Sequence, residues 1–354
     1  MSPFARALAL RFISRRSIGH RARTDEGLGA MTMAAKADLD LGAISLQMRQ
    51  VEEEIARSVA SQSPLLREVA VYMLSSGGKR IRPAMGMAGY LAAGGMDTAR
   101  MIPLAAAVEI IHTSTLLHDD VMDASDIRRG RPSAHRKYGM QAAIVTGDFL
   151  FSRAFSLCSR FGPEVIGITS EACRELAEAE MLQATPWREL TEELCVTIAA
   201  TKTGSLMRAG MEVAAVSAGA CAAERAMLRD FGQSVGTAFQ LIDDCLDFSL
   251  DGSSGKPAGG DILGGKATLP VVHALARASE NDKRTIEAFL EPGPGKGPIS
   301  GLVAILERTG SLDYARARAA EFSKDARERL GPLKGSAYKD ILLDITRFVL
   351  ERTS

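Results

Sequence analysis

Two aspartate clusters with the same spacing, Asp-Asp-x-x-Asp, lie far apart in this chain of 354 residues. Their members are Asp119, Asp120, Asp123, Asp243, Asp244 and Asp247. On a helix, the first and last aspartate of each cluster lie on one face about one turn apart, where like charges repel. Carboxylate oxygens suit Mg²⁺, which proteins usually hold with a few carboxylates, waters and substrate phosphates. The clusters therefore predict two acidic walls that face each other across Mg²⁺ and a diphosphate.

Basic residues follow both clusters and could bind the same anion. Arg128 and Arg129 follow the first cluster, and a guanidinium group offers paired donors that match phosphate oxygens. Lys256 and Lys266 lie in a glycine-rich segment after the second cluster. That segment is either an ordinary connector or a lid that brings its lysines onto a phosphate.

A third basic motif lies upstream, where residues 77–83 read Gly-Gly-Lys-Arg-Ile-Arg-Pro. Glycines before closely spaced cations allow the backbone and the side chains of Lys79 and Arg82 to approach an anion closely. The same pattern is also typical of a helix C-cap with basic residues near the end of the helix dipole.

Single polar residues within apolar helical sequence are open to two interpretations. His112 lies seven residues before Asp119, about two turns away on nearly the same helix face. It is either a structural histidine or a hydrogen-bond donor to a diphosphate. Lys202 and Thr203 lie in another apolar pattern, where a lysine can bind an anion or extend its charged end to solvent.

The elements expected to position these residues are helices. Beyond residue 35, strong helix formers dominate, apolar residues recur about once per turn, and the alternation typical of strands is missing. Among the glycine- and proline-rich breaks, only 252–260 and 292–298 are long enough to be loops. The sequence predicts a single all-α domain over residues 36–354, with both aspartate clusters on core helices.

Composition excludes several classes of protein. The formal net charge is +0, with 43 basic and 43 acidic residues, so the chain has no global basic field for nucleic acid. Its five cysteines are scattered and form no Cys-x-x-Cys pair, which favours a reducing compartment over a zinc site or a disulfide framework. No uninterrupted apolar run reaches the roughly 18 residues of a membrane span, so no transmembrane segment is expected.

The first 35 residues differ from the rest. Arginines are frequent there and no acidic residue precedes Asp25, which is typical of an organelle transit peptide. The plainer interpretation is a disordered extension, or a working start near Met31 or Met33. We expect a cytoplasmic protein, with mitochondrial import through this segment as the alternative, and residues 1–35 are left out of the predicted fold.

Taken together and in order, these motifs resemble those of the trans-isoprenyl diphosphate synthases. They are Gly-Gly-Lys-Arg-x-Arg-Pro, His-x6-Asp-Asp-x-x-Asp-x4-Arg-Arg-Gly, Gly-Asp-Phe-Leu, Lys-Thr and Phe-Gln-x-x-Asp-Asp-x-x-Asp, and the resemblance extends from about Leu46 to the C-terminus. It implies an isoprenoid-synthase-type helical bundle around a central cavity, usually a homodimer. It further implies an Mg²⁺-dependent prenyltransferase that condenses isopentenyl diphosphate with an allylic prenyl diphosphate.

The resemblance also assigns roles to individual residues. Isopentenyl diphosphate is expected to contact Lys79, Arg82, His112 and Arg129. Mg²⁺ is expected on Asp119, Asp123 and Asp243, with the remaining cluster members and Lys202 completing the catalytic set. The allylic substrate is expected to contact Arg128, Lys202, Thr203, Gln240, Lys256 and Lys266.

Product length depends on the residues just before the first cluster. In the family, enzymes that stop early often carry an aromatic residue there, whereas this chain carries Ser114 and Thr115, with Ile111 upstream. Small residues favour a long-chain all-trans polyprenyl diphosphate, such as a quinone side chain, over a geranylgeranyl or farnesyl product. A non-catalytic regulatory subunit is a remote alternative, because such partners usually lose an aspartate cluster or the basic residues, and both are intact here.

Overall fold

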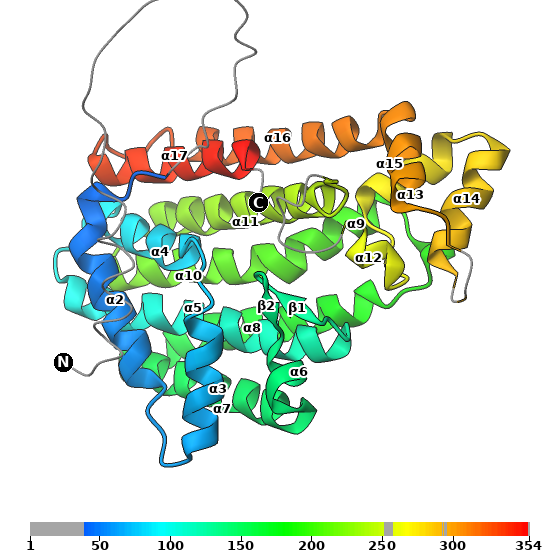
Figure 1. Cartoon of the computed structure of the whole chain (residues 1–354). Helices are drawn as coiled ribbons and strands as arrows, with labels where there is room; N and C mark the ends of the chain where they lie inside the picture. Colours follow the sequence, from blue (N-terminus) through cyan, green and yellow to red (C-terminus); the bar gives the residue numbers. More distant parts are fainter. Residues whose placement is uncertain (1–38, 251–257, 292, 294–295, 353–354) are drawn as a thin grey trace, which may run out of the picture.

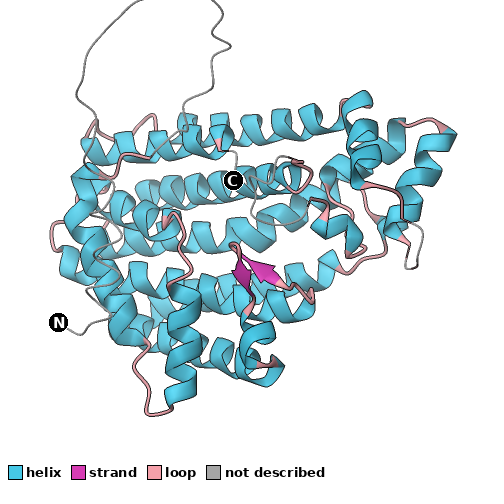
Figure 2. Cartoon of the chain, viewed as in Figure 1, coloured by secondary structure: helices cyan, strands magenta, loops and turns pink. Residues whose placement is uncertain are grey.

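The computed structural model describes residues 39–250, 258–291, 293 and 296–352. In these ranges the chain is almost entirely helical, with one very short hairpin (Figures 1 and 2). The α-helices are α2 (Ser45–Ser58), α3 (Pro64–Leu74), α4 (Ile81–Ala92), α5 (Thr98–Met122), α6 (Ala134–Tyr138), α7 (Met140–Cys158), α8 (Pro163–Gln183), α9 (Glu192–Ala199), α10 (Ser205–Ala218), α11 (Ala222–Leu246), α12 (Gly260–Leu263), α13 (Leu269–Arg277), α14 (Glu280–Leu290), α15 (Ile299–Arg308), α16 (Ser311–Arg329) and α17 (Ala337–Glu351). The remaining elements are the 3-10 helices η1 (Gly42–Ile44), η2 (Ser159–Phe161) and η3 (Trp187–Glu189), the π-helix η4 (Ala200–Gly204), and strands β1 (Ile127–Arg128) and β2 (Arg131–Pro132).

The long helices are stacked in layers. Figure 1 shows α16 and α17 along one edge, α11 and α10 beneath them, and α5, α8 and α7 toward the opposite side. Helix α5 packs against α7, α4 and α2, whereas α11 packs against α10, α16 and the π-helix η4. The two helices that carry the aspartate clusters are therefore inner helices, as the sequence predicted, and the all-α fold is confirmed.

Local sequence explains where these two helices begin. The Asp97 carboxylate accepts a hydrogen bond from the backbone N–H of Ala99 and caps the start of α5. Glu224 turns back to accept from the backbone N–H of Cys221, which caps the start of α11. Each cluster then falls at the opposite end of its helix, with Asp123 and Asp247 as the C-cap residues.

The hairpin is the one departure from a purely helical prediction in the described part of the chain. Its strands pair antiparallel, with Ile127 opposite Pro132 and Arg128 opposite Arg131. The two turn residues, Arg129 and Gly130, have φ of 53° and 72°. Positive φ at both positions is typical of a type I′ turn, where a non-glycine residue is uncommon. The sequence signal was the dipeptide Arg-Gly rather than a run of strand formers.

Helix α5 is long and apolar enough to cross a membrane by length and composition alone. Its best window has a mean hydropathy of 1.3, and 78% of that window is buried within the protein. Such burial is expected for the central helix of a bundle, which is apolar on all sides because other helices surround it.

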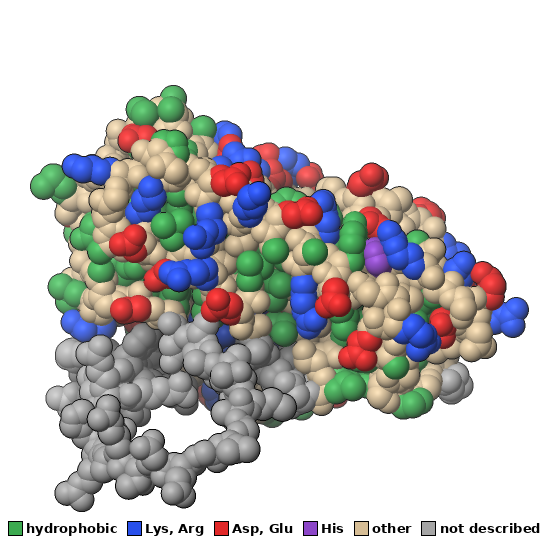
Figure 3. All heavy atoms as spheres, turned by 90° about the horizontal axis from the view of Figure 1, so that it is seen from above, with side chains coloured by type: hydrophobic (Ala, Val, Ile, Leu, Met, Phe, Trp, Pro, Cys, Tyr) green, Lys and Arg blue, Asp and Glu red, His purple; other side chains and the backbone are tan. Residues whose placement is uncertain are grey.

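The surface agrees with the balanced composition. On the face shown in Figure 3, acidic and basic side chains are interspersed rather than gathered into one basic field.

Candidate active site

The first aspartate cluster meets cations from three different elements. Asp120 is fully buried and accepts from Nε of Arg128 at 2.8 Å. Asp123 Oδ1 accepts from the Lys266 ammonium at 2.5 Å. Asp119 lies close to Lys202, whose positive charge opposes the effect of burial on that carboxylate. The loop after the second cluster thus reaches the first one, as the lid hypothesis requires, although Lys256 lies outside the described residues.

The cations around the first cluster do not fully balance the negative charge of its carboxylates. Burial raises the pKa of Asp119 to about 6, and Glu180 and Asp123 add to the rise, while Lys202 opposes it. The buried Oδ2 atom of Asp120 has no hydrogen-bond partner. The cluster lies at the C-terminal end of α5, where the helix dipole adds further negative potential. A cation is the group that would offset all three effects.

The second cluster is held by more varied partners. Asp243 forms an ion pair with Arg352 from the end of α17. Asp244 accepts from the Gln240 amide at 2.9 Å, and burial raises the pKa of Asp244 to about 8. Asp247 accepts from the backbone N–H groups of Gly260 and Asp261, both at 3.1 Å. Asp247 therefore also fixes the start of the short helix α12.

The π-helix η4 connects the two clusters. It carries Lys202, which pairs with Glu180 and donates to Gln183 at 2.7 Å on α8, near Asp119. The next residue, Thr203, donates to the Gln240 side-chain oxygen at 2.5 Å. A π-helical turn is rare and often marks a functional site, because it rotates successive side chains away from the regular helical positions. Here it directs one residue toward each cluster.

The predicted diphosphate-binding cations gather beside these clusters. Arg82 is half-buried, its buried Nε has no hydrogen-bond partner, and its guanidinium lies 5.8 Å from the centre of the Phe239 ring. Arg129 donates to the backbone oxygen of Gly77 and thereby holds the hairpin against the glycine motif. Lys79 lies over the ring of Phe348, at 4.7 Å from its centre. The hairpin and the 77–83 segment are brought together as one cationic wall.

His112 belongs to the same region. Burial first, and then the charges of Arg82 and Arg129, hold the pKa of His112 well below its usual range. A neutral imidazole keeps one N–H donor and one acceptor. His112 can thus donate a hydrogen bond to a diphosphate without adding a charge to an already cationic site.

The residues present fit Mg²⁺ in combination with a substrate. In the described ranges, no three His, Cys, Asp or Glu side chains converge on a single point. Mg²⁺ keeps several waters and commonly takes one or two carboxylates plus phosphate oxygens, so it does not need a complete protein cage. Such a site needs only a few hard oxygen donors from the protein, and the carboxylates of Asp119, Asp123 and Asp243 can supply them. Their metal-binding roles remain predictions.

Several contacts in the site were not anticipated. Arg352 is almost fully buried, donates to the Phe239 backbone oxygen at 2.9 Å, and lies 3.7 Å from the centre of the Phe239 ring. Phe348 lies one helical turn earlier, on the same side of α17. Glu180 and Gln183 on α8 hold Lys202. The i, i+4 spacing of Phe348 and Arg352 was the available sequence signal.

The predicted chain-length residues lie deep in the bundle. Ser114 is fully buried and its hydroxyl donates to the Gly147 backbone oxygen at 2.7 Å, so it faces α7. Thr115 donates to the backbone oxygen of His112 within α5. Ile111 is fully buried one turn upstream of Thr115. On an ideal helix Thr115 lies closer than Ser114 to the face of Asp119.

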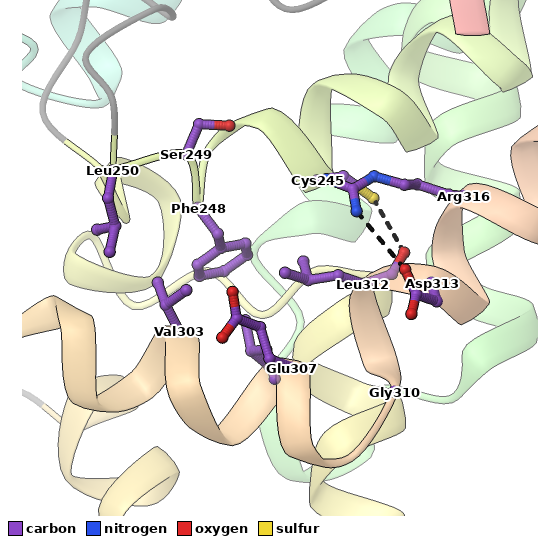
Figure 4. A pocket seen from close by; sticks show the side chains of 11 residues that line it. Cys245, Phe248, Ser249, Leu250, Val303, Glu307, Gly310, Leu312, Asp313 and Arg316 are labelled. Atoms are coloured by element: carbon purple, nitrogen blue, oxygen red, sulfur yellow. Dashed lines mark hydrogen bonds and ion pairs between the residues drawn. The ribbon is translucent and has the colours of Figure 1, made fainter. Parts of the chain in front are cut away.

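A separate pocket lies beside the C-terminal end of α11. It has a volume of about 490 Å³ and is lined by parts of α15, α16 and the end of α11 (Figure 4). Cys245 borders it, with its Sγ directed toward the Leu312 backbone oxygen at 3.9 Å. None of the predicted site residues lines this pocket. Burial raises the pKa of Cys245 to about 12, so its thiol is unreactive at neutral pH.

With this geometry in place, comparison with known proteins identifies the family. The family model described as polyprenyl synthetase matches residues 63–298. The chain belongs to the polyprenyl synthetase family. An octaprenyl diphosphate synthase of Escherichia coli (strain K12) is 35% identical over 309 residues, which cover 86% of this chain and 95% of the relative. A short chain isoprenyl diphosphate synthase of Methanothermobacter thermautotrophicus is 38% identical over 310 residues, which cover 85% and 95%.

A solved structure supports the same conclusion for this polyprenyl synthetase family member. A polyprenyl synthase from Caulobacter crescentus CB15, in complex with calcium and isoprenyl diphosphate, aligns with a TM-score of 0.85 and 33% identity, covering 90% of this chain and 99% of that chain. The predicted family, the isoprenoid-synthase-type all-α fold and the assignment as a trans-prenyltransferase are confirmed. The roles of individual site residues remain predictions.

Proposed function

We propose that this chain is an Mg²⁺-dependent synthase that condenses isopentenyl diphosphate with allylic prenyl diphosphates to a long-chain all-trans polyprenyl diphosphate. One observation carries the proposal. The π-helix η4 places Lys202 beside the first aspartate cluster and Thr203 on Gln240 beside the second. An allylic diphosphate between the clusters would therefore have acidic walls for metal on both sides and a lysine at its leaving group.

The reaction begins with departure of diphosphate from the allylic substrate. The C–O bond breaks and its electron pair stays on the diphosphate, whose growing charge Lys202, Lys266 and Arg128 would offset. Mg²⁺ on Asp119, Asp123 and Asp243 would supply further neutralisation of that charge when bound. The allylic carbon is left as a cation, and the surrounding apolar side chains keep water from it.

Bond formation then depends on the second substrate. Lys79, Arg82, Arg129 and neutral His112 would hold the diphosphate of isopentenyl diphosphate beside the allylic cation. The double bond of isopentenyl diphosphate attacks the allylic carbon, a new C–C bond forms, and loss of a proton restores an allylic double bond. The released diphosphate would accept this proton, since no protein base stands out among the site residues. The product is longer by five carbons and carries the diphosphate of the isopentenyl unit.

The long-chain product is supported by the octaprenyl relative and by the small side chains before the first cluster. A short-chain geranylgeranyl or farnesyl product is the second candidate, because a relative of similar identity is a short-chain synthase. A role in supplying quinone side chains fits the long-chain reading. A non-catalytic subunit is disfavoured, because both clusters and the basic wall are present.

Product analysis tests this proposal. The purified chain is incubated with labelled isopentenyl diphosphate, farnesyl diphosphate and Mg²⁺, and the products are dephosphorylated and separated by reversed-phase chromatography. We expect a series ending well beyond 20 carbons, and no product when EDTA replaces Mg²⁺. Accumulation of a 15- or 20-carbon product would support the short-chain candidate. No condensation by the chain alone would support the regulatory subunit.

Assembly and location complete the proposal. Met140, Ile144 and Val145 expose 60%, 39% and 46% of their surface on the first half of α7, which supports a homodimer through this helix. Light scattering of the purified chain tests it. A cytoplasmic location is proposed, with import into mitochondria through the arginine-rich residues 1–35 as the alternative. Deletion of residues 1–32 is expected to leave turnover and melting temperature nearly unchanged, and a large loss of either would contradict the proposed domain boundary.

A further inference from the structure

Glu109 is a buried carboxylate whose charge the hydrogen-bond network around it does not require. It lies on α5 and only 3% of its surface is exposed. Its Oε1 accepts from Nη1 of Arg80 at 2.8 Å. Arg80 is already paired with another carboxylate, because its Nε donates to Glu52 Oε1 at 2.6 Å. A neutral acceptor at position 109 would satisfy the remaining Arg80 donor equally well.

The resulting triad carries excess negative charge. One guanidinium lies between two carboxylates, one from α2 and one from α5, and also donates to the Leu74 backbone oxygen at 2.9 Å. Burying an additional charge is costly unless nearby charges offset it. Glu109 therefore needs further cations, and these lie in the diphosphate-binding wall.

Arg82 lies two residues after Arg80, and Arg129 donates to a backbone oxygen of the same glycine-rich segment. Glu109 lies about one turn before His112 on α5, whereas Glu52 lies on α2. The negative charge of Glu109 is also the largest effect that opposes the lowering of the Arg82 pKa by burial. Arg80 is the N-cap residue of α4 and has a left-handed backbone conformation, with φ of 49°. The two carboxylates of the triad thus share a partner, but only Glu109 shares a helix with a predicted diphosphate-binding residue.

We infer that Glu109 is a positioning residue that acts as a counter-charge beneath the isopentenyl diphosphate site and weakens the hold of Arg82 and Arg129 on a bound diphosphate. This inference rests on the proposed function. After each condensation the product carries the diphosphate of the isopentenyl unit, and that diphosphate must leave the cationic wall before the next round. A site without the counter-charge would bind its substrate more tightly and release its product more slowly.

Two matched substitutions separate charge from architecture. Glu109→Gln and Glu52→Gln each remove one carboxylate from Arg80 while keeping an amide oxygen as acceptor. Glu109→Gln leaves a neutral pair, so its melting temperature should not fall. Binding of inorganic diphosphate is measured by calorimetry in EDTA, which removes the metal-dependent allylic site. We expect Glu109→Gln to bind diphosphate about threefold to tenfold more tightly than the wild type, and Glu52→Gln to bind it with wild-type affinity.

Steady-state kinetics provide the second readout. For Glu109→Gln, KM for isopentenyl diphosphate should fall by a similar factor, KM for farnesyl diphosphate should stay unchanged, and kcat should fall. Equal affinities in all three proteins, weaker binding by Glu109→Gln, or no binding by the wild type in EDTA would each overturn the inference. Glu109→Asp keeps the charge and should bind diphosphate as the wild type does. If it deviates from the wild type, side-chain length rather than charge is the relevant property, and the inference also fails.

If the wild type binds diphosphate with the expected ratios but condenses no isopentenyl diphosphate, the proposed function fails while the counter-charge stands. If the wild type condenses its substrates but the variants do not show the expected affinity ratios for diphosphate, the counter-charge inference fails while the proposed function stands. The two failures are therefore distinguishable.

Discussion

The ends of α5 and α11 carry the same aspartate motif but are held in different ways. At the end of α5, the cluster is held by side-chain cations from other elements, namely Arg128 from the hairpin and Lys266 from the loop after α12. At the end of α11, Asp244 is held by an amide and Asp247 by two backbone N–H groups. The first cluster is thus balanced by charges, whereas most of the second is fixed by neutral donors.

The residues upstream of the two clusters differ as well. The last turns of α5 carry the small side chains of Ser114 and Thr115. The corresponding turn of α11 carries Phe239, and the guanidinium groups of Arg82 and Arg352 lie 5.8 and 3.7 Å from the centre of its ring. Large aromatic rings offer a face to cations, and small residues leave volume. We therefore expect α11 to contribute a rigid wall of the diphosphate region, and α5 to contribute the side along which a prenyl chain grows.

The largest expected effect concerns metal binding, the role that is predicted for both clusters. Asp119→Asn and Asp243→Asn are each expected to lower turnover by a factor of about 10² to 10³ or more, since the leaving diphosphate loses charge neutralisation. The melting temperature of Asp119→Asn should not fall, because the change removes one of several mutually repelling carboxylates. Asp243→Asn also breaks the ion pair with the buried Arg352, so its melting temperature should fall. Turnover is measured over a range of Mg²⁺ concentrations, with thermal unfolding as the control. Near-normal Mg²⁺-dependent turnover in either variant would exclude that residue as a ligand.

The second prediction separates the two cations that pair with predicted metal ligands. The side chain of Lys266 is 22% exposed and that of Arg352 is 4% exposed. Lys266→Gln is expected to lower turnover about tenfold through a lost phosphate contact, with no change in melting temperature. Arg352→Gln should also lower the melting temperature, because it removes a stacked guanidinium and a buried hydrogen bond. Equal melting temperatures in the two variants would remove the proposed contrast between a charge-balanced and a fixed cluster.

The third prediction tests the structural role of Asp247 against Asp123, its counterpart in the first cluster. Asp247→Ala removes the acceptor of two backbone N–H groups at the start of α12, which costs about 1–2 kcal/mol for a lost cap. A fall of about 2–4 °C in melting temperature is expected. Asp123→Ala breaks only a partly exposed ion pair with Lys266, so its melting temperature should change by less. A larger loss in Asp123→Ala would reverse the assignment of roles.

The sequence was sufficient where local rules decide the structure. The Asp97 cap, the helical spacing around α5 and α11, and the repeated aspartate motif depend on residues within a few positions of one another. The fold class and the placement of both clusters on core helices followed from them. That each cluster lies at the end of its helix was not predicted, because the C-caps Asp123 and Asp247 carry none of the usual glycine signals.

Contacts between distant segments could not be predicted in this way. Arg352 reaches Asp243 across 109 positions in the sequence, and Lys266 reaches Asp123 across 143. Only the packing of α17 and the loop after α12 brings these pairs together. The π-helical turn at Lys202 likewise has no composition that distinguishes it from the α-helices on either side. Glu109 was visible in the sequence as a charge within an otherwise apolar run, but its pairing with Arg80 was not predictable from the sequence.

The smallest expected effect on rate concerns product length and depends on the small residues of α5. Ser114→Phe is expected to shorten the product while leaving the initial condensation rate similar. Position 114 lies about 7.5 Å of helical rise before Asp119, so short allylic tails end near this level and longer tails must extend past it. A phenyl ring there would occupy volume that later intermediates need, because close-packed walls yield little.

The structure adds a control to this experiment. The Ser114 hydroxyl donates to the Gly147 backbone oxygen on α7, so the phenyl ring would also break that bond and press on α7. Ser114→Ala breaks the same bond without adding volume, and Thr115→Phe adds volume nearer the face of Asp119. Product chromatography should give shorter chains for both phenylalanine variants and the wild-type length for Ser114→Ala. If Ser114→Ala alone shortens the product, the α5–α7 contact rather than open volume limits chain growth. If neither phenylalanine variant changes the product, the chain grows along another helix, and the contrast drawn between α5 and α11 is wrong.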